Sequence, residues 1–141
     1  MAHRGGVVSN AAFKRQYAAI LAKAGAKAEL VVRQSAVALQ SGMVEKSPVD
    51  TGQFKGNWQC GIGALNLNTS AANDPSGSGA IAKTITALQG WKAGQTIYMT
   101  NSLPYARRLE FGWSQQAPAG MARLTVMDFQ RNVAQIVAGL R

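Results

Sequence analysis

Carboxylates are the first candidates for chemistry in this chain, because paired carboxylates carry out much acid–base catalysis. The chain has six, and no two of them form a recognisable catalytic pair: Glu29, Glu45, Asp50, Asp74, Glu110 and Asp128. We expect Asp50 to hydrogen-bond within its own turn, through Thr51 or Gly52. We expect Glu110 to form a salt bridge with the adjacent Arg107 or Arg108. Structural roles are therefore favoured over an active site.

Nucleophilic and metal chemistry would depend on a single histidine, His3, and a single cysteine, Cys60. A triad or a Cys–His pair would require His3, near the terminus, to be held in place. One cysteine excludes an internal disulfide and a zinc site with several thiolates. The Gly-x-Gly pairs at 61–63 and 77–79 lack the further glycine and the lysine of phosphate-binding loops. We therefore expect no enzyme, metal or cofactor, and a packed Cys60 thiol in a reducing compartment.

The net charge of +9 favours an acidic partner, either nucleic acid or an acidic protein surface. The basic residues gather toward both ends of the chain, and a solvated helix face is the ordinary explanation for most of them. Arg107 and Arg108 beside Tyr105 could bind phosphate and stack on a base. The charged fraction is only 15%, against about 25% in typical proteins. Either neighbouring subunits cover part of the surface, or this is a small alanine-rich domain with a neutral exterior.

The expected elements form one α+β domain over residues 1–141, with a twisted antiparallel sheet, a long N-terminal helix and a C-terminal helix. Apolar spacing predicts a first helix of up to roughly 38 residues before Pro48. Such a helix, about 55 Å long, would extend past the domain or pack on another chain. Gly25 is a possible break in it. No stretch has the ~20 apolar residues of a membrane span, and the start lacks a secretory signal.

The remaining expectations follow from turn and periodicity signals. Residues 1–8 are expected to be flexible, and the long loop 66–79 to be mobile until a neighbour orders it. The other elements are a turn at 47–53, strands within 54–67 and 96–101, and helices at 80–90, 105–111 and from Met121, where 122–126 could instead be an edge strand.

Three segments, in order, resemble one protein family. They are 47–58 (SPVDTGQFKGNW), 97–112 (IYMTNSLPYARRLEFG) and 116–123 (QAPAGMAR). Together they are similar to the tail-completion, or neck, proteins of siphophages, which join head to tail. The family shows a Pro-hydrophobic-Asp-Thr-Gly turn, a tryptophan, a Pro-Tyr-Ala, a Glu-x-Gly and a Pro-x-Gly-Met stretch. Gln53 departs from the small apolar residue frequent there.

The resemblance implies a structural virion protein in the phage neck, made in the host bacterial cytoplasm. It would form a ring, expected to be a hexamer, between a head-side connector or stopper protein and a tail terminator protein. Contact with channel DNA would be non-specific, and no membrane would be involved. The alternative is a basic nucleic-acid-associated protein that binds phosphate without sequence specificity.

The resemblance and the composition nominate interface or structural residues. We expect Trp58 and Tyr105 in the core. Trp91 and Trp113 could be core or interface aromatics. The arginines at 107, 108 and 123 could hold a neighbour's carboxylate, face DNA, or simply be solvated. The full set is Asp50, Thr51, Gly52, Trp58, Trp91, Asn101, Pro104, Tyr105, Arg107, Arg108, Glu110, Trp113 and Arg123.

Overall fold

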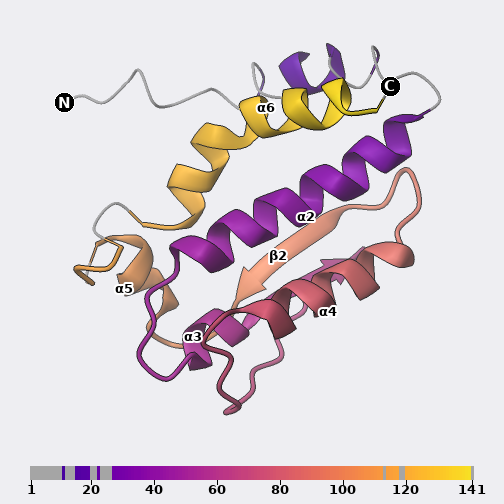
Figure 1. Cartoon of the computed structure of the whole chain (residues 1–141). Helices are drawn as coiled ribbons and strands as arrows, with labels where there is room; N and C mark the ends of the chain where they lie inside the picture. The colour runs from indigo at the N-terminus through magenta and orange to yellow at the C-terminus, as the bar shows by residue number, and fades with distance from the viewer. Residues whose placement is uncertain are drawn as a thin grey trace.

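A central helix, α2 (Ala28–Lys46), organises the computed structural model of the chain. The structure describes residues 11, 15–19, 22, 27–112, 114–117 and 120–140. Helix α6 (Ala122–Ala138) lies along one side of α2, and the sheet with α4 (Ser78–Gln89) lies on the other (Figure 1). The short helices α3 (Gln53–Gly56) and α5 (Ala106–Glu110) lie at one end of the molecule, on the left of Figure 1. Mixed helix and antiparallel sheet confirm the α+β class.

The helix α2 has 19 residues, about half of the helix expected from the apolar spacing. Lys27 precedes it with φ −96° and ψ 10°, outside the helix. At 1.5 Å per residue α2 is about 28 Å long, which a domain of this size can cover. Residues 15–19 form a separate helical stretch, and Tyr17 packs edge-on against Phe129 of α6 at a centroid distance of 5.3 Å. The structure therefore does not confirm one continuous helix of about 38 residues, and Gly25, the possible break, lies outside the described residues.

The sheet contains two antiparallel strands, β1 (Trp58–Ile62) and β2 (Ile97–Asn101), with Trp58 opposite Asn101 and Cys60 opposite Met99. Cys60 packs against Ala36 of α2 and Leu88 of α4, because alternate strand residues point to the helical layer. The strand expected within 54–67 is shorter, since residues 53–56 form α3. Helix α6 replaces the possible edge strand at 122–126.

A cluster of buried apolar side chains joins the elements at the α3–α5 end of the molecule. Trp58 and Phe54 pack there with residues of α2 and with Met121 at the start of α6. Trp58 is only 6% exposed, which confirms its expected place in the core. The ends of α2, β2 and α6 are thereby fixed around one apolar centre, and this end of the molecule contains the segments considered next.

The loop 66–79 is held at several points within the single chain. The buried Asn57 side chain exchanges two hydrogen bonds with the Ser70 backbone, Nδ2 to O at 2.9 Å and N to Oδ1 at 2.8 Å. The Asp74 carboxylate accepts the amides of Gly79 (3.3 Å) and Ala80 (3.0 Å) in the first turn of α4. Helix α4 consequently begins at Ser78, earlier than the expected residue 80. These bonds argue against a loop that only a neighbouring subunit can order.

Candidate assembly surface at the α3–α5 end

The three segments that carry the family resemblance meet at one end of the fold. We call this end the motif corner, comprising the described residues of 47–58, 97–112 and 116–123. The Gln116 side chain pairs with the backbone of Val49: Oε1 accepts the Val49 amide at 2.8 Å, and Nε2 donates to the Val49 carbonyl at 3.1 Å. The Asn101 side chain donates to the Phe54 carbonyl at 2.9 Å. Segments far apart in sequence are thus joined by specific polar contacts.

The turn at residues 50–53 is held by Thr51 and Gly52. The Thr51 hydroxyl accepts the Gln53 amide at 3.3 Å. The Gly52 carbonyl accepts the amides of Gly56 (3.0 Å) and Asp74 (3.1 Å). Gly52 has φ +90°, and a Cβ there would lie 2.3 Å from the Pro75 nitrogen, so only glycine fits without a shift. This turn therefore anchors both α3 and the end of loop 66–79.

Asp50 does not hold this turn, contrary to expectation. Its side chain is exposed, and within the described part of the chain it makes no hydrogen bond or ion pair. It lies beside a surface hollow of about 370 Å³. We call this the Asp50 hollow; its lining includes Pro48, Val49, Asp50, Phe54, Tyr105 and Leu109. The hollow thus combines a carboxylate that has no partner among the described residues with aromatic, aliphatic and uncharged polar side chains.

Tyr105 forms part of the wall of the hollow rather than of the core. It is 40% exposed, and its ring contacts that of Phe54 at a centroid distance of 5.8 Å. The expectation of a core tyrosine is wrong, because Phe54 and Trp58 already fill the apolar centre. Tyr105 instead covers Phe54 with one face and leaves part of its ring to solvent.

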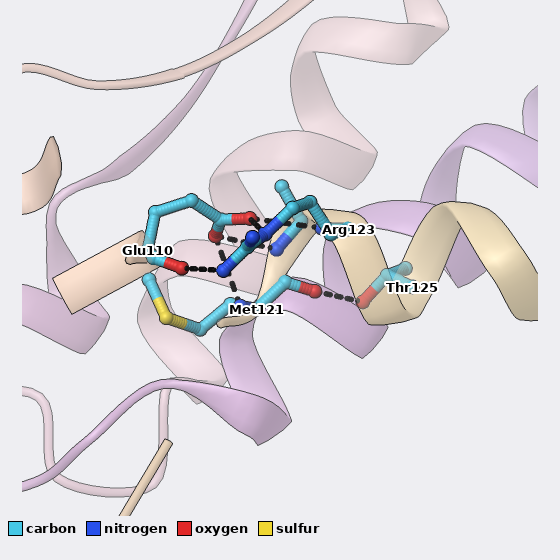
Figure 2. Close-up of polar contacts among 5 residues, drawn as sticks. Glu110, Met121, Arg123 and Thr125 are labelled. Atoms are coloured by element: carbon cyan, nitrogen blue, oxygen red, sulfur yellow. Dashed lines mark hydrogen bonds and ion pairs between the residues drawn. The ribbon is translucent and has the colours of Figure 1, made fainter. Parts of the chain in front are cut away.

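Glu110 caps α6 from a different element (Figure 2). Its Oε1 accepts the amides of Met121 and Ala122, both at 2.9 Å, and its Oε2 accepts the amide of Arg123 at 3.0 Å. The Arg123 Nε donates to Oε2 at 3.1 Å, and the Arg123 guanidinium also donates to the Glu110 carbonyl. The expected salt bridge to Arg107 or Arg108 is replaced by this pair. A carboxylate suits the positive end of a helix.

These contacts decide the protonation of Glu110. Burial alone would raise the pKa of the carboxyl, but hydrogen bonds from three backbone amides and the Arg123 side chain favour its ionised form. The net result is a pKa below the usual value. The close approach requires Gly120 with φ +88°, because a Cβ there would lie 2.4 Å from the Glu110 carbonyl oxygen. Glu110 is therefore an ionised structural cap.

Phe111 is flanked by two guanidinium groups on the outside of the motif corner. The Arg123 guanidinium lies 4.9 Å from the ring centroid and that of Arg107 lies 5.7 Å from it. Phe111 nevertheless remains 57% exposed. Arg107 has no carboxylate partner within the described part of the chain. An aromatic ring between arginines is typical of a surface that binds another molecule.

The remaining nominated residues differ in burial and position. Trp91 is buried: its Nε1 donates to the Gln95 carbonyl at 2.9 Å, and Arg33 stacks on it at 5.3 Å and binds its carbonyl. It therefore closes the end of α4 and offers no interface anchor. Pro104 and Arg108 are exposed at α5. Trp113 lies outside the described residues.

Sequence reasoning did not nominate several residues that build this end of the molecule. Gln116 lies within the quoted segment 116–123, so the segment itself pointed to it. Asn57 binds Ser70, 13 residues away, and Asp74 binds Ala80, 6 residues away. No local signal in the sequence identifies such pairs. Among the described residues, no cluster of three or more His, Cys, Asp or Glu side chains could hold a metal ion.

None of the helices in the described part of the chain is both long and apolar enough to cross a bilayer. Comparison with protein-family models matched no family, and comparisons with curated proteins and with solved structures matched none either.

Proposed function

We propose that the chain is a structural virion protein of a tailed bacteriophage, forming a ring in the neck that joins the head connector to the tail. The ring is expected to be a hexamer around the DNA channel, with a connector or stopper protein on one side and a tail terminator on the other. The protein would act through surfaces rather than through turnover.

The observation that carries this proposal is the meeting of the three resembling segments in one corner. Segment 47–58 binds 116–123 through Val49 and Gln116, and 97–112 through Phe54 and Asn101. Glu110 links 97–112 to the start of α6. A set of short segments that is ordered in sequence and bonded in space is a structural unit, which supports reading the resemblance as a shared fold element.

The surface composition adds support from physical chemistry. Charged residues are few, at 15%, and several large apolar side chains are exposed, namely Leu30, Leu65, Leu67, Ile85, Tyr105, Phe111, Val126 and Met127. Phe, Tyr, Met and Arg are enriched at protein interfaces. A subunit whose surface is covered by neighbours in a particle would have such an exterior.

The test is to look for the chain in particles purified from the strain that encodes it. Mass spectrometry should detect it at a stoichiometry of a few copies per virion, and cryo-microscopy of the neck should place the α2–α6 fold in a ring. Its absence from purified virions would end the proposal. A monomer in dilute solution would not, because such rings can require a partner surface for assembly.

A second candidate is phosphate binding without sequence specificity, which the stacking of Arg107 and Arg123 on Phe111 favours. Affinity for duplex DNA should then fall steeply with salt, since released counterions drive such binding. Arg107→Ala should weaken the binding, whereas Lys92→Ala, an exposed cation in the turn after α4, should change it less. No binding at ~50 mM salt would remove this candidate.

A further inference from the structure

We propose that two copies of this chain bind head to tail through opposite sides of α5, with Arg107 of one copy entering the Asp50 hollow of the next. The inference rests on the proposed function, because it assigns the contact that would build the ring. The argument rests on the opposite charges of Asp50 and Arg107 and on their places on the two sides of α5.

The two surfaces face away from each other because of helix geometry. The Leu109 amide donates to the Tyr105 carbonyl, and the Phe111 amide donates to the Arg107 carbonyl, so residues 105–111 follow a helical course. Tyr105 and Leu109 share one side of this course and line the Asp50 hollow. Arg107, two residues after Tyr105, is rotated by about 200° from it and lies on the side of Phe111. The two surfaces therefore lie on opposite sides of α5.

The charges left over inside the subunit are complementary. Glu110 and Asp74 cap helices, and Glu29 and Asp128 lie near arginines or a lysine. Asp50 has no such partner within the described part of the chain. Arg33, Arg123 and Arg131 bind carbonyl or carboxylate groups, whereas within the described part of the chain Arg107 contacts the Phe111 ring and no carboxylate. Among the described residues, Asp50 and Glu45 are carboxylates without a partner, and of these two only Asp50 lines the hollow. The hollow and Arg107 lie on opposite sides of α5.

The hollow also has the chemistry that a guanidinium group prefers. Its lining includes the Asp50 carboxylate and the partly exposed Tyr105 ring, which can take the charge and the flat face of an arginine. The surface that would bring this arginine is itself ordered, because Phe111 lies between Arg107 and the Arg123–Glu110 pair. Preordered groups lose less entropy on binding.

Contacts between two different surfaces of the same subunit are heterologous. Such contacts repeat from copy to copy and close into a ring where the rotation allows it. A pairing of like surfaces would instead give a closed dimer. The proposed contact is therefore of the kind that a ring needs, and it uses a second copy of this chain as the partner.

Charge reversal in the full chain tests the contact. Asp50→Arg and Arg107→Asp should each weaken self-association by roughly tenfold or more, measured by sedimentation over the widest soluble concentration range. The double variant, Asp50→Arg with Arg107→Asp, should restore association, since opposite charges again meet between copies. Glu45→Arg and Lys92→Asp make the same charge changes at other exposed positions and should leave association near that of the wild type.

Every outcome either supports or overturns the proposed contact between Arg107 and the Asp50 hollow. Weakening by both single variants with restoration by the double variant supports the contact, and retained circular dichroism and melting temperature show that the variants fold. Unchanged association, weakening that the double variant does not relieve, or equal weakening by the controls overturns it. A wild-type chain that stays monomeric throughout also overturns it, whereas only absence from virions overturns the proposed function.

Discussion

Replacing Glu110 with alanine removes a cap that reaches α6 from a separate helix. Its carboxylate binds three consecutive backbone amides, those of Met121, Ala122 and Arg123, which no preceding turn of α6 can satisfy. The side chain is 18% exposed, so water reaches it only in part. The variant would leave the first turn of α6 without its acceptor and would weaken the link between α5 and α6.

The cost can be estimated from the individual contacts. The hydrogen bonds to the Met121 and Ala122 amides are partly buried, and hydrogen bonds to charged groups contribute about 1.5–3 kcal/mol each. The bond to the Arg123 amide is exposed, and the Arg123 side chain is 52% exposed, so both add little. Water entering the vacated space recovers part of the loss. We expect a decrease in the free energy of unfolding of about 2–3 kcal/mol, a large part of the usual 5–15 kcal/mol.

Urea unfolding followed by circular dichroism measures this change, with the slope against urea unchanged and the midpoint lowered. The matched control is Glu45→Ala, which removes an exposed carboxylate that has no partner among the described residues. It should change the free energy by no more than about 0.5 kcal/mol. If Glu110→Ala also changed the free energy of unfolding by no more than about 0.5 kcal/mol, the capping role would be refuted.

The pH dependence gives an independent check with Glu110→Gln. The folded-state pKa of Glu110 is below its unfolded value, so its ionised form stabilises the fold. This contribution is fully present above the unfolded pKa of about 4.5 and is lost as the pH falls through the folded pKa. The difference in unfolding free energy between the wild type and the variant should be widest at neutral pH. It should narrow as the pH falls below about 4.5 and through the folded-state pKa. A gap that is constant down to the acid limit would contradict the argument.

Three further predictions concern the turn, the loop and the thiol. Gly52→Ala should lower the free energy of unfolding by more than about 3 kcal/mol, and the melting temperature with it, because the residue has φ +90° and its new Cβ would meet Pro75. A variant as stable as the wild type would contradict this. Asn57→Ala should speed proteolysis within 66–79 by releasing Ser70, and an unchanged cleavage pattern would show that other contacts hold the loop. Cys60, buried and with a raised pKa, should react slowly with a thiol reagent until urea unfolds the chain, and fast reaction of the folded chain would exclude the packed position.

Local signals in the sequence predicted much of the fold. The apolar periodicity of 80–90 and of the region after Met121 gave α4 and α6 within a few residues. Pro48 and Gly112 marked real ends of helical segments, because proline and positive-φ glycine act on their own backbone. Trp58 was correctly placed in the core, since tryptophan side chains are highly buried on average.

Contacts between distant residues could not be predicted in this way. Asp74 caps α4 from before its start and Glu110 caps α6 from another helix, so neither position shows the usual cap spacing. The short helix α3 replaced the first part of a predicted strand because the Gly52 carbonyl binds the Gly56 amide, which alternation of apolar residues does not reveal. The position of Tyr105 depended on Phe54 and Trp58 occupying the core cluster, which only the three-dimensional packing reveals.

The motif corner divides its residues between two tasks, and this division determines which experiments are informative. Gly52, Trp58, Asn101 and Glu110 have inward bonds or contacts, so changing them tests folding. Asp50 and Arg107 are exposed and make no hydrogen bond or ion pair with other described residues, so a defect in their variants reports on a partner. Loss of particles from a Gly52 variant would therefore carry no information about assembly. The charge-reversal pair is the experiment that separates assembly from folding, because its two positions are not bonded within one subunit.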